Sequence, residues 1–298
     1  MIFLLEIRTD LASELCEGKN AAESVKAYTD VIGGMKVDFV ELDAENGRRL
    51  GKSAGKYATA DVGRIWESDR TRFSSVSDSL SKLFGSFFGT VGKGCVLVAG
   101  LGNMGVTADS VGPRVTKKLL VTNHIKTLDP ALFDSVGFGD VASVSPGVMG
   151  QTGIESSELV ISAAKCCGAS LIVAIDSLAS HSLSRLGTTV QITDAGILPG
   201  SGVFNTRGGI TKESAGVPVV AVGVPTVVDA STLALDLMSG GSDTSLAEKL
   251  LSGRGRTLFI TPKETDVIAE KTASLIACAL NLALHKNIPS EEMAEYTA

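Results

Sequence analysis

The stretch GCVLVAGLGNMGVTADSVGP, residues 94–113, places a buried strand, a glycine-rich turn and an aspartate in one run. Residues 95–99 are apolar and include two valines, which is typical of a strand buried on both faces of a parallel sheet. The glycines within residues 100–105 then allow a tight turn at the carboxyl end of this strand. Open α/β sheets bind their ligands at this edge, and Asp109 follows the turn directly.

A second aspartate, Asp176, closes another predicted buried strand, residues 171–175, in the segment LIVAIDS. If the two strands are neighbours in one sheet, both carboxylates project into the same crevice. Like carboxylates at short range cannot both ionise cheaply, so Asp109 and Asp176 should share a proton and titrate as a pair. The ionised member could take a proton from water, while the protonated one polarises a carbonyl and later protonates a leaving amine. The alternative for either aspartate alone is a helix cap or a turn residue.

Composition restricts the class of protein. The chain has 298 residues, 44% of them hydrophobic and 20% charged, which is typical of a globular protein with one large domain or two small ones. The net charge of −6, without runs of like charge, gives no nucleic-acid footprint. The five cysteines form no CxxC pair and are expected to be small buried hydrophobic residues in a reducing compartment. No apolar run reaches the ~20 residues that span a bilayer, so we expect a cytoplasmic protein without membrane attachment.

From residue 94 onward, short β-branched runs alternate with helical patterns, which predicts an α/β fold with helices on both sides of a sheet. TPKE, residues 261–264, is interpreted as a capping box at the start of a long C-terminal helix. Residues 11–92 are harder to interpret, with one strand predicted at 35–42. Further strands are predicted at 141–144, 188–192, 217–222 and 258–260, and helices at 112–124 and 156–167.

Other catalytic templates fit poorly. Residues 100–105 match G-x-G-x-x-G, but the carboxylate expected about 20 residues later is present only as Asp129, so a tight turn is favoured over a dinucleotide site. The segment 51–56 is one residue too short for a P-loop. The three histidines lack metal-ligand spacing. Ser177 and His181 resemble a nucleophile and its base, but a short helical surface pair is the favoured interpretation.

Long sequence blocks resemble the germination protease family, the endopeptidases that degrade small acid-soluble spore proteins when a bacterial spore germinates. The resemblance covers most of residues 94–231 and 258–285. It is carried by VAGLGNMGVTADSVGP, SVSPGVMGQTGIESSELV, IVAIDSLASHSLSRLGTTVQITDAGILPGSG, VPVVAVGVPTVVDA and TPKETD.

This resemblance implies an atypical aspartic-type peptidase whose essential aspartates fall on Asp109 and Asp176. It also implies a three-layer αβα sandwich around a mostly parallel sheet, related to the hydrogenase maturation proteases, a homotetramer, and a location in the cytoplasm of the forespore or spore core. No cofactor is expected. In the hydrogenase maturation proteases the corresponding acidic positions bind nickel together with a histidine, and this chain shows no clear counterpart of that histidine.

Members of this family are made as zymogens that remove their own N-terminal peptide. Cleavage follows an acidic residue, and a large apolar residue and alanine come after the cleaved bond. The segment TDLA, residues 9–12, fits this pattern, so the resemblance implies cleavage between Asp10 and Leu11. Residues 1–10 would then be the propeptide, and 11–298 a single peptidase domain. An ordinary strand or turn is the alternative for this segment.

An acidic residue before the cleaved bond requires a cation in the enzyme, because burial of a bare carboxylate is costly. Arg207, in a glycine-rich loop, and Lys212 are the candidates for binding this acid. The expected partners are small acid-soluble spore proteins as substrates, with no direct contact to nucleic acid. The alternative functions are a Rossmann-like nucleotide-binding protein and a nickel-dependent protease of the hydrogenase maturation type.

Overall fold

The computed structural model describes residues 9–16, 25–89, 94–198, 208–230, 258–285, 287–289 and 293. Its strands form one sheet of nine strands in the order β1-β2-β3-β7-β8-β6-β4-β5, with β9 paired to β8. The strands are β1 Lys26–Ile32, β2 Met35–Leu42, β3 Gly55–Asp61, β4 Cys95–Gly100, β5 Val141–Val144, β6 Ala169–Ser180, β7 Thr189–Thr193, β8 Val219–Asp229 and β9 Phe259–Ile260.

The sheet is mixed. Strands β5, β4, β6 and β8 pair in parallel, as predicted for the strands at 95–99, 141–144 and 171–175. The remaining pairs are antiparallel, and they add β1, β2, β3 and β7 to one side of the parallel strands. The predicted strand at 35–42 is confirmed as β2, and it belongs to this antiparallel part.

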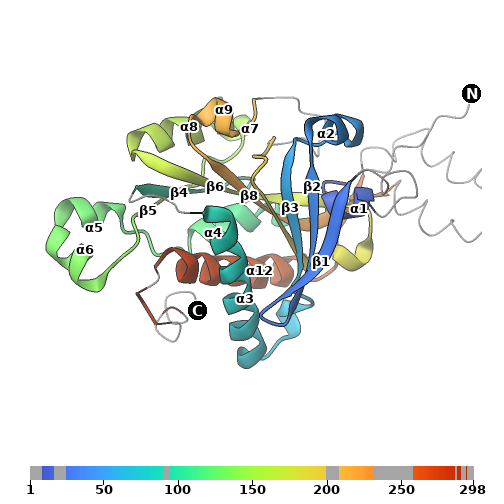
Figure 1. Ribbon diagram of the computed structural model, residues 1–298, viewed down its shortest axis with the longest axis horizontal. Coiled ribbons are helices and arrows are strands. Elements are labelled where there is room, and N and C mark those ends of the chain that lie inside the picture. The colour runs from blue at the N-terminus through green and yellow to red at the C-terminus, as the bar shows by residue number, and fades with distance from the viewer. Residues whose placement is uncertain are drawn as a thin grey trace, which may run out of the picture.

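Helices cover both faces of the sheet and make three layers (Figure 1). The longest, α3 and α12, pack on one face together with α4, while α8 packs on the other. The helices are α1 Ala12–Cys16, α2 Ala44–Leu50, α3 Arg70–Phe88, α4 Val111–Thr116, α5 Asn123–Leu128, α6 Pro130–Val136, α7 Met149–Thr152, α8 Ser156–Cys166, α9 Lys212–Ala215 and α12 Thr265–Leu284, with 3₁₀ turns η1 Ile65–Glu67, η2 Thr107–Asp109 and η3 Leu183–Arg185.

Side-chain alternation along β6 assigns each residue to a face. Val173 and Ile175 belong to the core beneath α3 and α12, whereas Ile172 and Ala174 belong to the core beneath α8. Because successive strand residues point to opposite faces, Asp176 projects to the α8 face of the sheet. This assignment decides which elements can contribute to a site around Asp176.

The predicted helix at 112–124 is wrong in its length. Helix α4 ends at Thr116, and the next helix, α5, begins at Asn123. Between them the amide of Leu120 donates to Oδ1 of Asn281 on α12 at 3.0 Å, and the Thr122 amide donates to the carbonyl of Val141 at 2.9 Å. These bonds hold the backbone outside a helix, and a local sequence pattern cannot show them.

The predicted capping box at residues 261–264 is also wrong. Helix α12 begins at Thr265, with Glu264 at the N-cap position and without a side-chain cap. The hydroxyl of Thr265 donates to the carbonyl of Pro262, which closes the turn before the helix. By length and composition α12 could cross a membrane, but 67% of its most apolar window is buried inside the protein, as in a core helix.

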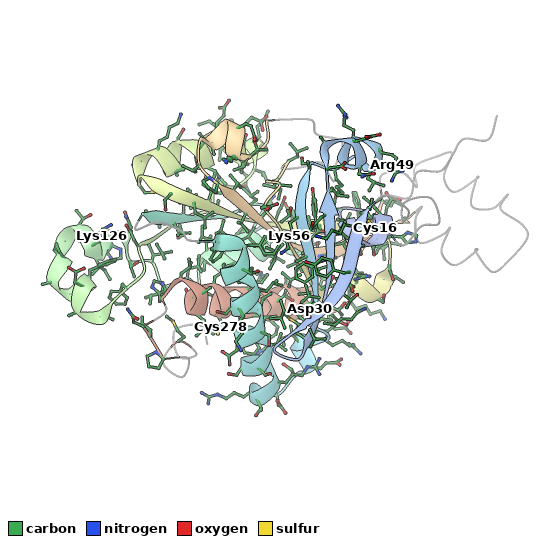
Figure 2. All side chains as sticks on the ribbon, in the orientation of Figure 1. Cys16, Asp30, Arg49, Lys56, Lys126 and Cys278 are labelled. Carbon is green, nitrogen blue, oxygen red and sulfur yellow. The ribbon has the colours of Figure 1, made fainter. Side chains whose placement is uncertain are left out.

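The cysteines differ in burial. Cys278 on α12 and Cys95 on β4 are buried, as expected for small hydrophobic side chains, whereas Cys166 at the end of α8 is exposed. Figure 2 places Cys16 and Cys278 on separate elements, α1 and α12. The expectation of buried cysteines is therefore confirmed for Cys95 and Cys278 and wrong for Cys166, while Cys16 and Cys167 are half-buried.

Candidate active site

Asp109 lies in η2, after the glycine-rich turn that follows β4. The amide of Asn103 donates to both the backbone carbonyl and Oδ2 of Asp109, each at 2.9 Å. The Asn103 side chain in turn accepts from the amide of Gly105 at 2.9 Å. On the opposite side, Thr226 of β8 donates to the carbonyl of Ala108 at 2.6 Å. The turn and β8 together therefore fix the backbone around Asp109.

The glycines of this turn allow close backbone contacts. A Cβ atom on Gly102 would lie 2.2 Å from the Asp109 carbonyl oxygen, and Gly102 has a φ of +108°. A Cβ on Gly100 would lie 2.2 Å from the carbonyl oxygen of Gly112 in α4. Gly100 therefore lets α4 pack on β4, and Gly102 lets Asp109 approach the turn.

These contacts argue against a phosphate site at residues 100–105. The amides of Leu101, Asn103 and Gly105 already donate to protein oxygens, and the oxygen at Asn103 belongs to the Asp109 carboxylate. No helix begins at the last glycine, because α4 starts at Val111. A dinucleotide site needs these amides and a helix N-terminus for the pyrophosphate.

Asp176 lies within β6, which continues to Ser180, so the expectation that Asp176 closes its strand is wrong. Strand β4 ends at Gly100, which pairs with Ile175. Asp176 is therefore the first β6 residue beyond the end of β4. Its Oδ1 accepts a hydrogen bond from the Ser177 amide at 2.9 Å.

Both carboxyl groups have raised pKa values, and the charge of Asp109 contributes to the shift of Asp176. Burial raises the pKa of Asp109 to about 6, while the Asn103 amide acts in the opposite direction. Burial, and after it the charge of Asp109, raise the pKa of Asp176 to about 8, while the Ser177 amide acts in the opposite direction. The charge of Asp10 adds a smaller upward contribution. The structure thus brings the two aspartates into one electrostatic unit, and their catalytic role stays a prediction.

A row of paired residues connects Asp176 to the neighbouring strands. Asp176 pairs with Gly223 of β8, and Gly223 pairs with Gln191 of β7. Directly paired residues project to the same face of a sheet, so the Asp176 and Gln191 side chains lie on the α8 face with a glycine between them. The side chain of Leu178 covers that glycine.

The segment TDLA, predicted to be cleaved, lies beside this row. The Asp10 amide donates to the carbonyl of Ala179 on β6, and the Ala179 amide donates to Oδ2 of Asp10, both at 2.9 Å. Leu11 is fully buried, and Ala12 begins α1 against Val40 and other apolar side chains of β2 and β3. The predicted bond between Asp10 and Leu11 is thus held at the end of β6.

Two polar side chains contact the carbonyl oxygen of Asp10. Lys52 Nζ donates to it at 3.0 Å and Gln191 Nε2 at 3.1 Å. Neither residue was a candidate from the sequence. Lys52 belongs to the segment 51–56 that fails as a P-loop, and Gln191 is a polar residue, 6% exposed, between the buried Val190 and Ile192. The available signal in the sequence was a glutamine between two β-branched apolar residues of a predicted strand.

Within the part of the chain that the structure describes, no contact supports the proposed roles of the other candidate residues. Lys212 is the first residue of α9 and is exposed, and Arg207 lies outside the described residues, so both stay predictions as acid-binding residues. Ser177 lies in β6 and His181 follows it, so the expectation of a helical pair is wrong. The Ser177 hydroxyl and His181 Nδ1 have no hydrogen-bond partner, which excludes a preformed nucleophile–base pair.

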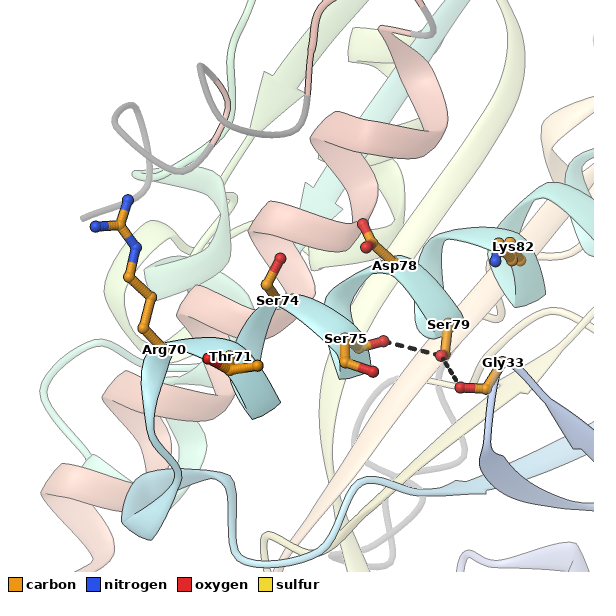
Figure 3. Close-up of a pocket in the computed structure, with 8 residues that line it drawn as sticks. All are labelled: Gly33, Arg70, Thr71, Ser74, Ser75, Asp78, Ser79 and Lys82. Atoms are coloured by element: carbon orange, nitrogen blue, oxygen red, sulfur yellow. Dashed lines mark hydrogen bonds between the residues drawn. The ribbon is translucent and has the colours of Figure 1, made fainter.

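The described residues offer no cluster of metal ligands, and one surface pocket lies away from the aspartates. Within the described ranges, no three His, Cys, Asp or Glu side chains gather at a metal-binding distance. A pocket of about 560 Å³ lies between the β1–β2 turn and α3, lined by Gly33, Ser79 and other residues (Figure 3). Helix α3 packs on the sheet face opposite to Asp176, so this pocket is separate from the aspartates.

Comparison with known proteins identifies the family. The germination protease family matches residues 5–240 and 239–297. The germination protease of Caldanaerobacter subterraneus is 38% identical over 324 residues, covering 98% of each chain. Those of Clostridium perfringens and Bacillus licheniformis are 35% and 34% identical, covering 98% and 97% of this chain and 99% and 96% of their own.

A solved structure, a NiFe hydrogenase maturation protease from Thermococcus kodakarensis, is 21% identical with a TM-score of 0.36, covering 66% of this chain and 98% of its own. The matches to the germination proteases extend over nearly the full length of both chains, at identities above 30%. The chain therefore belongs to the germination protease family, and this membership makes it a peptidase.

Proposed function

We propose that this chain is an endopeptidase that degrades small acid-soluble spore proteins at germination and cleaves them after an acidic residue. Its family membership over nearly the whole chain supports this substrate class. The observation that carries the chemistry is the electrostatic unit of Asp109 and Asp176, two carboxyl groups with raised and unequal pKa values at the end of β4. Such pairs divide the roles of base and acid in hydrolysis.

In the proposed reaction, the ionised Asp109 accepts a proton from water as the water oxygen bonds to the peptide carbonyl carbon. The C–N bond of the tetrahedral intermediate then breaks, and the leaving nitrogen takes the proton of Asp176. The products are a new carboxyl terminus and a new amine. Transfer of the proton from Asp109 to Asp176 through solvent restores the starting state.

The difference in pKa supports this division of roles. A group with a pKa of about 6 is largely ionised at neutral pH, as Asp109 must be to act as a base. A group with a pKa of about 8 is largely protonated there, as Asp176 must be to act as an acid. The Asn103 amide donates to the Asp109 carboxylate and so favours its ionised form.

The same site is proposed to process its own chain. Cleavage between Asp10 and Leu11 would release residues 1–10 and convert the zymogen into an active enzyme. The position of Asp10, whose charge reaches Asp176, supports this proposal. The proposal also includes assembly as a homotetramer, a location in the spore core and no direct contact to nucleic acid.

A peptide containing Thr-Glu-Ile-Ala tests the activity and its alternatives together. The chain is expected to cleave the peptide after Glu, to keep its rate when a chelator is added, and to show no binding in an NAD titration. A matched peptide with Lys in place of Glu should be cleaved far more slowly. Absence of cleavage combined with NAD binding would favour the nucleotide-binding alternative, and loss of the rate with the chelator would favour the nickel protease.

A further inference from the structure

The Asp10 side chain lies in a site that suits an acid. Its Oδ2 accepts from the Ala179 amide at 2.9 Å, and its Oδ1 lies 3.9 Å from Lys52 Nζ. Both side chains are largely removed from water, with 18% of Lys52 and 16% of Asp10 exposed. A carboxylate in such surroundings needs a charged partner and a hydrogen-bond donor, and here it has one of each.

The two donors on the Asp10 carbonyl are held in place by the fold. The Lys52 amide donates to the carbonyl of Gly47 at 2.9 Å, which attaches Lys52 to the end of α2. The Gln191 side chain also accepts from the Ala12 amide at 2.8 Å through Oε1. Gln191 thus contacts the backbone on both sides of the Asp10–Leu11 bond, and this second contact fixes which end of its amide faces the Asp10 carbonyl.

Sheet register relates these donors to the aspartates. Gln191 and Asp176 lie on the same face and are separated by one strand, a span of about 10 Å between their backbones. The intervening residue is Gly223. The Leu178 side chain fills the space over this glycine. A peptide held like the segment 9–12 contacts Gln191 through its carbonyl oxygen, and its acidic side chain lies near enough to Asp176 to raise the pKa of that group.

We propose that Lys52, Gln191 and the Ala179 amide form the site for the acidic residue that precedes the cleaved bond. Lys52 and Ala179 bind its carboxylate, and Lys52 and Gln191 donate to the carbonyl oxygen of the bond to be cleaved. This proposal rests on the proposed function, and it treats the segment 9–12 as a substrate bound in its own chain.

The carbonyl contacts have a chemical consequence. When water adds to the carbonyl carbon, the π electrons of the C=O bond move to the oxygen, which becomes an oxyanion. Hydrogen bonds to an oxyanion are stronger than those to a neutral carbonyl, so the Lys52 and Gln191 donors stabilise the transition state more than the ground state. These two donors would polarise the carbonyl, so Asp176 keeps its proton for the leaving amine.

A double-mutant cycle on self-processing tests the acid site. The full-length chain, Lys52→Met, Asp10→Asn and the double variant are incubated, and the rate of loss of residues 1–10 is followed by intact mass. Lys52→Met should slow processing by about 10²-fold or more, as for loss of an oxyanion donor. Asp10→Asn should slow wild-type processing clearly, yet change the Lys52→Met rate little, because the charge partner is already absent. Lys36→Met, at an exposed lysine of β2, is the control and should match wild type.

Gln191→Met tests the second donor and should slow processing by about 10²–10³-fold whether residue 10 is Asp or Asn. Lys52→Arg retains the positive charge, so it should still process a chain with Asp at residue 10 faster than one with Asn there. Thermal unfolding confirms that each variant is folded. Two results would overturn the acid site while leaving the proposed peptidase function intact. One is a Lys52→Met chain that loses residues 1–10 at the wild-type rate. The other is a double variant whose rate is reduced by the product of the two single-variant factors. A wild-type chain that cleaves neither itself nor a Thr-Glu-Ile-Ala peptide would instead overturn the proposed function.

Discussion

Asp109 and Asp176 carry the same carboxyl group in different surroundings. Burial raises the pKa of Asp109 to about 6, while the hydrogen bond from the Asn103 amide favours its ionised form. The pKa of Asp176 is raised to about 8 by burial and by the negative charge of Asp109. At neutral pH the pair therefore holds one proton, mainly on Asp176.

This order of pKa values predicts a bell-shaped pH dependence. As pH rises through about 6, Asp109 loses its proton and becomes a base, so kcat/KM for an acidic-site peptide should increase. As pH rises through about 8, Asp176 loses the proton that the leaving amine needs, so kcat/KM should decrease. Steady-state kinetics from pH 4 to 10 measure both limbs. A rate that keeps increasing above pH 9 would contradict the role of Asp176 as an acid.

At the residue scale, the sequence was informative for the aspartates and uninformative for their neighbours. Asp109 follows the turn after β4, and Asp176 follows the apolar run 171–175 within β6, which pairs in parallel with β4. Lys52 and Gln191 reach Asp10 only through the antiparallel strands and the end of α2, contacts between residues more than 40 positions apart. No local pattern encodes contacts of this kind.

At the scale of elements, the connection between β4 and α4 positions Asp109. Gly102 has a φ of +108°, and a Cβ there would lie 2.2 Å from the Asp109 carbonyl oxygen. Gly102→Ala should therefore displace Asp109 as well as strain the turn, and we expect a stability loss of about 1–3 kcal/mol together with nearly complete loss of peptide cleavage. Thermal unfolding and peptide kinetics measure the two effects.

Gly34→Ala is the matched control. Gly34 also has a positive φ, +87°, but a Cβ there would meet nothing within 4 Å. This variant should lose only the part of the stability that comes from the strained φ, and it should keep its activity. Full activity in Gly102→Ala would show that the position of Asp109 does not depend on this turn.

Element boundaries show where pattern-based prediction reaches its limit. Buried strands such as β4 and β5 were predicted because apolar runs ended by glycine or proline are distinctive. Helix α3 was missed because its serines make the segment look polar, although the hydroxyls of Ser77 and Ser79 are satisfied by backbone carbonyls one turn earlier. Helix α4 stops early because Asn281, distant in sequence, binds the backbone after it.

At the scale of the whole molecule, the N-terminal portion is part of the sheet and of the site. Strands β1 to β3 extend the sheet beyond β7, and apolar side chains of β2, β3 and α2 pack in one cluster with Ala12. The parallel strands that the sequence predicted supply Asp109 and Asp176, while the antiparallel part supplies Gln191. Both halves of the sheet thus meet at the Asp10–Leu11 bond.

Self-processing of the full-length chain tests the catalytic role of the aspartate pair directly. The full-length chain, Asp109→Asn, Asp176→Asn and the control Asp134→Asn, an exposed residue of α6, are incubated at pH 7 and their intact masses are followed. Wild type and Asp134→Asn should lose residues 1–10 and begin at Leu11, whereas both site variants should stay intact although folded. Removal of residues 1–10 at the wild-type rate in either Asp109→Asn or Asp176→Asn would contradict catalysis by the aspartate pair.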